Sequence, residues 1–305
     1  MSIAAAIADT LEEQPHHNKP QKAGKLTPYW LMLPGLLWLA IFFVVPLVTL
    51  FGTSLMTPVP GGEVGEFEQT FHFANYWNTL TDSTYYVPLF RSFLYAGAAT
   101  LLALAIGYPL AYAIAFKGGK YRNLLLVLVI APFFVSFILR TVAWRQILAD
   151  EGPVVAILRW AGLVSETGGV YPSAFAVIMG LTYNFLPFMT LPIYASLERV
   201  DHRLIEAAGD LYAKPITGFR KVTFPLSLPG VVAGTLLTFI PAAGDYVNAA
   251  LLGRPSNTMI GNRIEYTFLS VNDYPTAAVL SFILMASILV LVLFYVRRLG
   301  TEDLV

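Results

Sequence analysis

The sequence contains no cysteine, and its charge is low for a chain of 305 residues. Without cysteine there are no disulfides, no thiolate chemistry and no cysteine-ligated zinc sites. Charged residues make up only 12% of the chain, whereas a soluble globular domain carries about 25%. The net charge is zero, which excludes the strongly basic surface typical of nucleic-acid-binding proteins.

Sequence patterns of catalysis and nucleotide binding are also missing. Gly118–Tyr121 lacks the spacing and the Ser or Thr of a phosphate-binding P-loop. No nucleophile–base set stands out, and no histidine pair has the helical spacing of metal ligands. We therefore expect no enzyme, no cofactor and no metal, and no ATP bound by this chain.

What the chain does have is a series of long apolar runs. Hydrophobic residues make up 56% of it, and the mean hydropathy is +0.64. A helix needs about 20 apolar residues to cross about 30 Å of hydrocarbon. Six runs meet this requirement, within residues 29–55, 92–116, 123–147, 167–197, 226–250 and 274–296. We predict an all-α integral membrane protein with six transmembrane helices, although the uncharged part of the third run covers only residues 123–139.

The basic residues predict the orientation of these helices. If both termini face the cytosol, most of the lysines and arginines lie on the cytosolic side, as the positive-inside rule requires. We then expect a disordered cytoplasmic tail at 1–28, a transmembrane domain at 29–298 and a short cytoplasmic tail at 299–305.

The segment between the fourth and fifth runs has the pattern of an amphipathic helix. Leu204, Ala207, Ala208 and Leu211 fall at i, i+3, i+4 and i+7, which places them on one helix face. Asp201 and Pro215, which flank them, are expected to cap the helix and to limit its length. Two interpretations remain open: a helix resting on lipid headgroups, or a surface on which a soluble protein docks.

A resemblance bears on this choice. Glu206-Ala207-Ala208, followed at a fixed distance by Val222-Thr223-Phe224-Pro225, resembles the EAA loop of the permease subunits of bacterial type I ABC importers. The loop covers about 198–225. Tyr212 stands where the family usually has Gly, Val222 where it has Ile, and Phe224 where it has Leu.

The resemblance implies a MetI-like permease fold and a loop that couples the chain to a cytosolic ATPase. The coupling residues it implies are Glu206, Ala207, Ala208, Tyr212, Val222, Phe224 and Pro225. It also implies an ABC ATPase dimer that binds the ATP, a second permease subunit, an extracytoplasmic solute-binding protein and a location in the bacterial inner membrane.

Other segments are similar to one branch of the family, the spermidine/putrescine transporter permeases. They are Ile106–Tyr112, Leu139–Arg145, Asn184–Tyr194, Gly244–Tyr246 and Leu251–Gly253. The likeness implies polyamine uptake. Import of a sugar, an anion or chelated iron remains an alternative, as do an ATP-independent channel or carrier and a membrane anchor for a cytosolic complex.

Asp245 is the acid most suited to a cationic solute. It follows an uncharged run near the outer end of the expected fifth helix, where a carboxylate is costly unless it faces water or a partner. The carboxylate could bind an ammonium group, and Tyr246 could add a cation–π contact. Asp245 could instead pair with Arg140 or Arg145, or reach the outer water. We expect both arginines to extend toward lipid headgroups.

Overall fold

The structure is a computed structural model that describes residues 27–162, 164–165 and 169–299. The chain divides into two units, residues 1–50 and 51–305, and each is described by itself. The predictions made for 1–26 and 300–305, which form most of the two expected tails, lie outside the described residues.

The first unit is an apolar helix interrupted by one π-helical turn. It contains α2 (Thr27–Leu39) and η1 (Ala40–Val44), and α3 (Val45–Ser54) begins in it. The 23 residues from Met32 to Ser54 are apolar and long enough to cross a membrane. The first predicted span is therefore confirmed.

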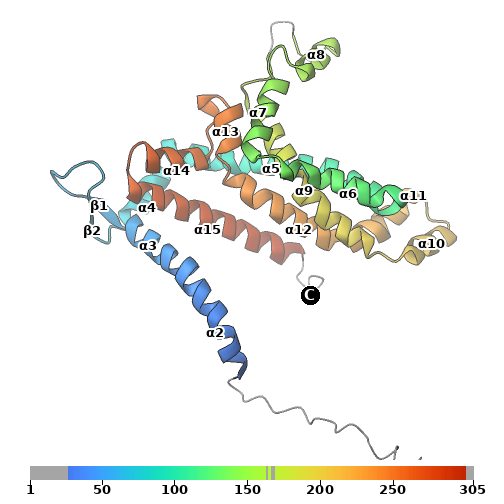
Figure 1. The fold of residues 1–305 in the computed structure, drawn as a ribbon, viewed down its shortest axis with the longest axis horizontal. Helices are drawn as coiled ribbons and strands as arrows, with labels where there is room; N and C mark the ends of the chain where they lie inside the picture. Colours follow the sequence, from blue (N-terminus) through green and yellow to red (C-terminus); the bar gives the residue numbers. More distant parts are fainter. Residues whose placement is uncertain (1–26, 163, 166–168, 300–305) are drawn as a thin grey trace, which may run out of the picture. The chain divides into compact units, whose positions relative to one another are not determined.

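The second unit is helical apart from one small hairpin (Figure 1). The hairpin pairs β1 (Met56–Pro58) with β2 (Phe67–Gln69) in antiparallel register, with Thr57 opposite Glu68. The helices of the first half are α4 (Ala74–Thr81), α5 (Ser83–Lys117), η2 (Gly119–Tyr121), α6 (Arg122–Ile130), η3 (Ala131–Phe134), α7 (Phe137–Ile147) and α8 (Pro153–Trp160). Those of the second half are α9 (Ala174–Glu198), α10 (His202–Asp210), α11 (Pro215–Gly218), η4 (Phe219–Thr223), α12 (Phe224–Ala243), α13 (Val247–Leu252), η5 (Pro255–Asn257), α14 (Ile260–Leu269) and α15 (Tyr274–Leu299).

The centre of this unit consists of α5, α9 and α12, which lie side by side (Figure 1). Small residues let their backbones approach closely. A Cβ at Gly230 would lie 2.4 Å from the carbonyl oxygen of Pro192, and one at Gly234 would lie 2.9 Å from that of Met189. The bundle therefore depends on glycine at these two places on α12.

The third predicted span is broken, which corrects the expectation of one helix over 123–147. Gly119–Phe134 and Phe137–Ile147 meet at an angle of 96°. Pro132 lies at the break, where the α-helix becomes a 3-10 turn and Val135 takes an extended conformation. Proline lacks the N–H that a continuing helix needs and crowds the preceding turn. The two arms form either a broken span or a re-entrant segment.

The fifth span begins and ends earlier than the predicted 226–250, since it runs from Pro215 to Ala243. The helix α12 ends at Ala243, and α13 begins only at Val247. Asp245 lies between them, and its Oδ1 accepts a hydrogen bond from the backbone N–H of Asn248 at 2.7 Å. This carboxylate caps the new helix, because the first N–H groups of a helix have no partner within it.

Within the described residues, five helices are long and apolar enough to cross a membrane, or six if the broken pair counts as one span. The second, fourth and sixth predicted spans correspond to α5, α9 and α15. The all-α membrane prediction is therefore confirmed, with the hairpin as a small addition. The predicted cytosolic position of both termini stays a prediction.

Candidate functional site

The helix α10 forms where the amphipathic pattern predicts it. Asp201 precedes it, and its Oδ1 accepts a hydrogen bond from the N–H of Arg203 at 2.9 Å. The helix ends at Asp210, and Pro215 begins the separate helix α11. The expected cap and the expected end are therefore both confirmed.

Within the described residues, much of the apolar face of this helix is left uncovered. Leu204 is 49% exposed and Leu211 is 82% exposed, although both belong to the face predicted to be apolar. Glu206 and Ala207 are also exposed, and no residue of α10 is buried. Large apolar side chains left open beside polar ones mark a contact surface.

The two halves of the EAA-like motif lie close together in the structure. The helix α10 packs against α11 and against the π-helical turn η4, which contains Val222. A Cβ at Gly218 would lie 3.9 Å from the Cβ of Ala208. Phe224 and Pro225 follow as the first residues of α12. The loop therefore connects the exposed helix directly to the start of a membrane-spanning helix.

Tyr212 has the backbone conformation that glycine ordinarily provides. Its φ is +59°, in the left-handed region, and its side chain is 97% exposed. A non-glycine residue pays about 1–2 kcal/mol there. The sharp turn after α10 thus exists without the glycine usual in the family.

Replacing Tyr212 by Gly is expected to leave the turn intact, whereas Tyr212→Val should loosen it. Valine is β-branched and disfavours a positive φ more strongly than tyrosine does. Limited proteolysis of the 198–225 loop in the purified protein measures this, with Tyr212→Phe as the control that keeps the ring. Equal cleavage rates for the Gly and Val variants would contradict the role of the left-handed turn.

An aromatic cluster that the sequence pattern did not reveal joins this loop to α5. The ring of Tyr108 lies 5.7 Å from that of Phe219 and 5.8 Å from that of Phe224. The hydroxyl groups of Tyr108 and Ser227 are 2.8 Å apart. Phe224, expected to act in coupling, therefore also packs against a neighbouring membrane-spanning helix.

The two candidate solute residues have different surroundings. Asp245 is 9% exposed and caps α13, whereas Tyr246 is 48% exposed. Within the described residues no ion pair joins Asp245 to Arg140 or Arg145. The alternative in which Asp245 is neutralised by one of these arginines is therefore wrong for this conformation.

Arg140 is buried rather than extended toward headgroups, which corrects the expectation. It is 7% exposed, and its guanidinium carbon lies 5.3 Å from the ring centre of Phe133 and 5.7 Å from that of Phe137. Its Nε and Nη1 have no hydrogen-bond partner within the described residues. The guanidinium thus lies beside aromatic rings from both sides of the bend.

A buried polar cluster, which no sequence pattern indicated, lies where α7, α9 and α13 meet. Asn184 donates through Nδ2 to Thr141 Oγ1 and to Asn248 Oδ1, both at 3.1 Å. All three side chains are buried. Buried amides need such partners, because an unpaired polar group is costly away from water. The cluster therefore ties the second arm of the broken span to α9 and α13.

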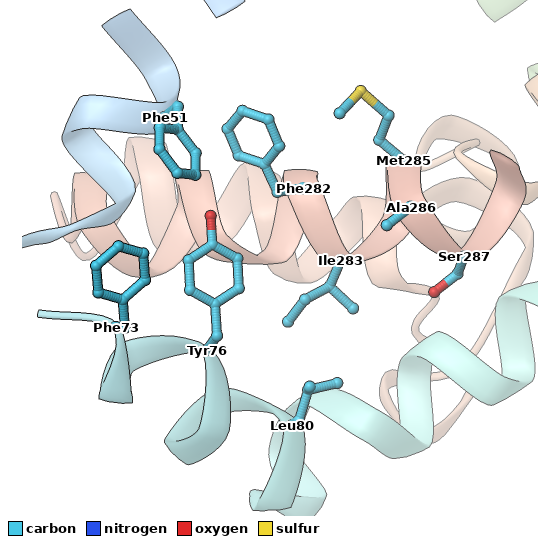
Figure 2. A pocket seen from close by; sticks show the side chains of 9 residues that line it. All are labelled: Phe51, Phe73, Tyr76, Leu80, Phe282, Ile283, Met285, Ala286 and Ser287. Carbon is cyan, nitrogen blue, oxygen red and sulfur yellow. The ribbon is translucent and has the colours of Figure 1, made fainter. Parts of the chain in front are cut away.

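An apolar cavity beside α15 offers no charge to a solute. Figure 2 shows this cavity of about 520 Å³ between the end of α3, α4 and α15. Its lining includes Phe51, Phe73, Tyr76, Phe282, Ile283 and Met285. The Tyr76 hydroxyl lies 2.8 Å from the Ser54 hydroxyl. An apolar surface of this kind suits hydrocarbon rather than a cation. Within the described part of the chain, no cluster of three or more acidic or histidine side chains is placed to hold a metal.

Comparison with known proteins places these features in a family. Residues 103–299 match the model described as "Binding-protein-dependent transport system inner membrane component". The chain is 36% identical over 260 residues to the spermidine/putrescine transport system permease protein PotB of Escherichia coli (strain K12), covering 85% of this chain and 93% of that protein. It is 30% identical over 295 residues to the inner membrane ABC transporter permease protein YdcU of the same organism, covering 90% of each.

Solved structures of ABC transporters have folds similar to that of this chain. A bacterial alginate ABC transporter in complex with alginate pentasaccharide-bound periplasmic protein matches with a TM-score of 0.69 at 19% identity, over 88% of this chain and 92% of that chain. The MetNI methionine ABC transporter, in an inward facing conformation, matches with a TM-score of 0.51 at 21% identity, over 70% of this chain and 94% of that chain. Members of the matched family are transport subunits, and ATP is hydrolysed by a separate subunit. The chain therefore belongs to the family of binding-protein-dependent transport system inner membrane components, as a multi-pass ABC importer permease of the bacterial inner membrane.

Proposed function

We propose that this permease imports polyamines of the spermidine and putrescine class. The observation that carries the proposal is its 36% identity to a spermidine/putrescine permease over 85% of the chain. A buried acid supports it, because Asp245 is 9% exposed and no arginine neutralises it within the described residues. An ammonium group entering from water would supply the missing positive charge, and the exposed ring of Tyr246 would supply a cation–π face.

The energy for transport comes from a cytosolic ATPase that docks on α10. The residues that make the docking surface are Glu206, Ala207, Ala208 and Tyr212, with Val222, Phe224 and Pro225 connecting it to α12. Support comes from the apolar face of α10, on which Leu204 is 49% and Leu211 82% exposed. This assignment puts the 198–225 loop in the cytosol, and both termini with it if the broken third span crosses the membrane.

The complete transporter contains more than this chain. A second permease completes the solute path, two ATPase subunits bind the ATP, and an external binding protein delivers the polyamine. Closure of the ATPases on ATP moves the docked helices and opens the path outward, and hydrolysis returns it inward. Such alternation is a rigid-body movement of one helix set against another.

Uptake by the reconstituted transporter tests the proposal. The permease, coexpressed with its partner subunits, is placed in vesicles with ATP inside and the binding protein outside, and labelled spermidine and putrescine are followed. We expect uptake that needs ATP and is blocked by unlabelled polyamine. Competition by a sugar, an anion or chelated iron instead would show another solute, and uptake without ATP would show a channel or carrier.

A further inference from the structure

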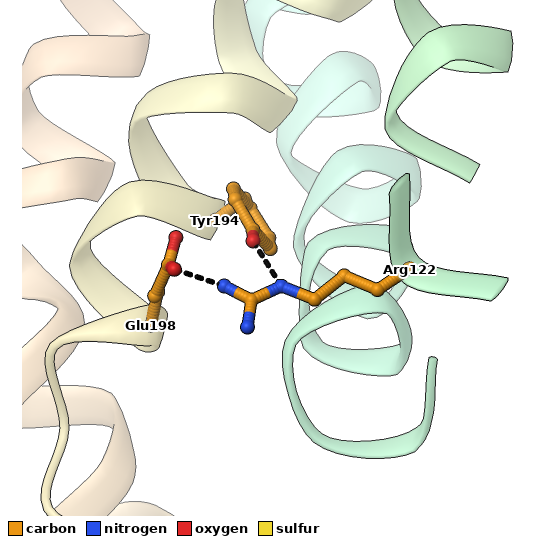
Figure 3. Close-up of polar contacts among 3 residues, drawn as sticks. All are labelled: Arg122, Tyr194 and Glu198. Carbon is orange, nitrogen blue, oxygen red and sulfur yellow. Dashed lines mark hydrogen bonds and ion pairs between the residues drawn. The ribbon is translucent and has the colours of Figure 1, made fainter. Parts of the chain in front are cut away.

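One arginine connects two membrane-spanning elements just before the coupling loop. Arg122 is the first residue of α6, and Glu198 is the last residue of α9. The Arg122 guanidinium forms an ion pair with the Glu198 carboxylate through Nη2, and its Nε donates to the Tyr194 hydroxyl (Figure 3). The same guanidinium lies 5.1 Å from the centre of the Tyr194 ring. We call these three residues the Arg122 clamp.

The clamp is not placed to contribute much stability. The side chains of Arg122 and Glu198 are 33% and 48% exposed, and ion pairs at such exposure contribute little because water screens them. Its geometry is nevertheless restrictive. A planar guanidinium that meets a carboxylate, a hydroxyl and a ring face at once has few other orientations open to it. The clamp therefore fixes the position of α6 relative to α9 and adds little to the stability of the fold.

The clamp occupies the point where the coupling loop begins. Glu198 lies three residues before Asp201, which caps α10. Arg122 lies near the start of the first arm of the broken third span, and Thr141 on the second arm is hydrogen-bonded to Asn184 of α9. The helix α9 thus holds the broken span on both sides of its bend, once through the clamp and once through the buried polar cluster.

We propose that the Arg122 clamp is a positioning contact through which movement of the coupling helix α10 reaches the broken third span. This inference rests on the proposed docking of the ATPase on α10. A shift of α10 displaces the end of α9 that carries Tyr194 and Glu198, and the clamp makes α6 follow. Without the clamp, the ATPase still docks on α10, but the movement of α10 is transmitted less completely to the broken third span.

Charge reversal and charge exchange test the clamp in the complete transporter. The variants are Arg122→Glu, Glu198→Arg and the double exchange of both. We expect each single variant to retain the ATPase on purification and to hydrolyse ATP, while polyamine uptake per ATP hydrolysed falls at least fivefold. The double exchange restores the ion pair with its direction reversed, and we expect it to recover at least half of the original ratio.

Milder variants keep the test informative if a reversal prevents folding. Glu198→Gln and Tyr194→Phe remove one polar partner each with little change in shape, and we expect both to lower the uptake-to-hydrolysis ratio at least twofold. Unchanged ratios in the folded variants, or loss of the ATPase from them on purification, would overturn the clamp. Failure of the unaltered chain to bind an ATPase would instead overturn the proposed docking on α10.

Discussion

Replacing Glu206 by lysine is expected to lower ATP-driven uptake at least tenfold and to weaken retention of the ATPase. Glu206 is exposed on α10 beside Ala207, on a helix with no buried residue. If the ATPase presents a basic group to Glu206, the reversal places like charges together, which costs several kcal/mol. A tenfold loss needs only about 1.4 kcal/mol. Uptake into vesicles and copurification of the ATPase measure the two effects.

The matched control is Glu68→Lys, which makes the same change at an exposed position of β2. We expect this variant to retain the ATPase as the unaltered chain does, because the hairpin is predicted to lie on the opposite side of the membrane. Both variants should appear in the membrane in equal amounts. Normal uptake and normal complex recovery in Glu206→Lys would exclude α10 as the docking surface.

Replacing Asp245 by asparagine is expected to reduce polyamine uptake at limiting substrate about tenfold or more. The amide oxygen of asparagine still accepts the hydrogen bond from the N–H of Asn248, so the cap on α13 is kept while the charge is removed. A hydrogen bond to a charged group is worth about 1.5–3 kcal/mol, which corresponds to a loss of this size. Initial uptake rates over a range of spermidine concentrations measure it.

The comparison variant is Asp245→Ala, which removes the charge and the cap together. A lost helix cap costs about 1 kcal/mol, so this variant should also unfold at a lower temperature in detergent. If Asp245 served only as a cap, asparagine would leave uptake unchanged and alanine alone would impair the protein. Unchanged uptake kinetics in Asp245→Asn would therefore remove Asp245 from the solute path.

Proline content shows where prediction from the sequence stops. Pro109, Pro187 and Pro192 lie inside α5 and α9, which continue through them, whereas the chain turns by 96° near Pro132. A proline weakens a helix at any of these positions, and neighbouring helices decide whether it breaks. At the third span, the bent arrangement lets Thr141 form hydrogen bonds with Asn184 of α9 and Asn248 of α13.

Asp245 is a charged residue whose surroundings could not be predicted from the sequence either. Its position after an uncharged run in the sequence indicates that its charge is costly to bury. The sequence does not indicate which groups surround it. In the structure, the Asp245 side chain caps α13. It can do so because α12 ends before it, at Ala243. The Arg122 clamp was not predicted either, because Arg122 lies 72 positions or more from both of its partners and no periodicity connects it to them.

By itself the sequence determined that this is a helical membrane protein with an amphipathic helix between its fourth and fifth spans. Transfer of an apolar run into hydrocarbon depends on its own residues, and helix periodicity and capping are local as well. Only the tertiary structure decided which proline breaks its helix, which face of α10 stays uncovered and which arginine meets Glu198. These features depend on contacts between residues far apart in the chain, whose geometry is set only when the helices pack.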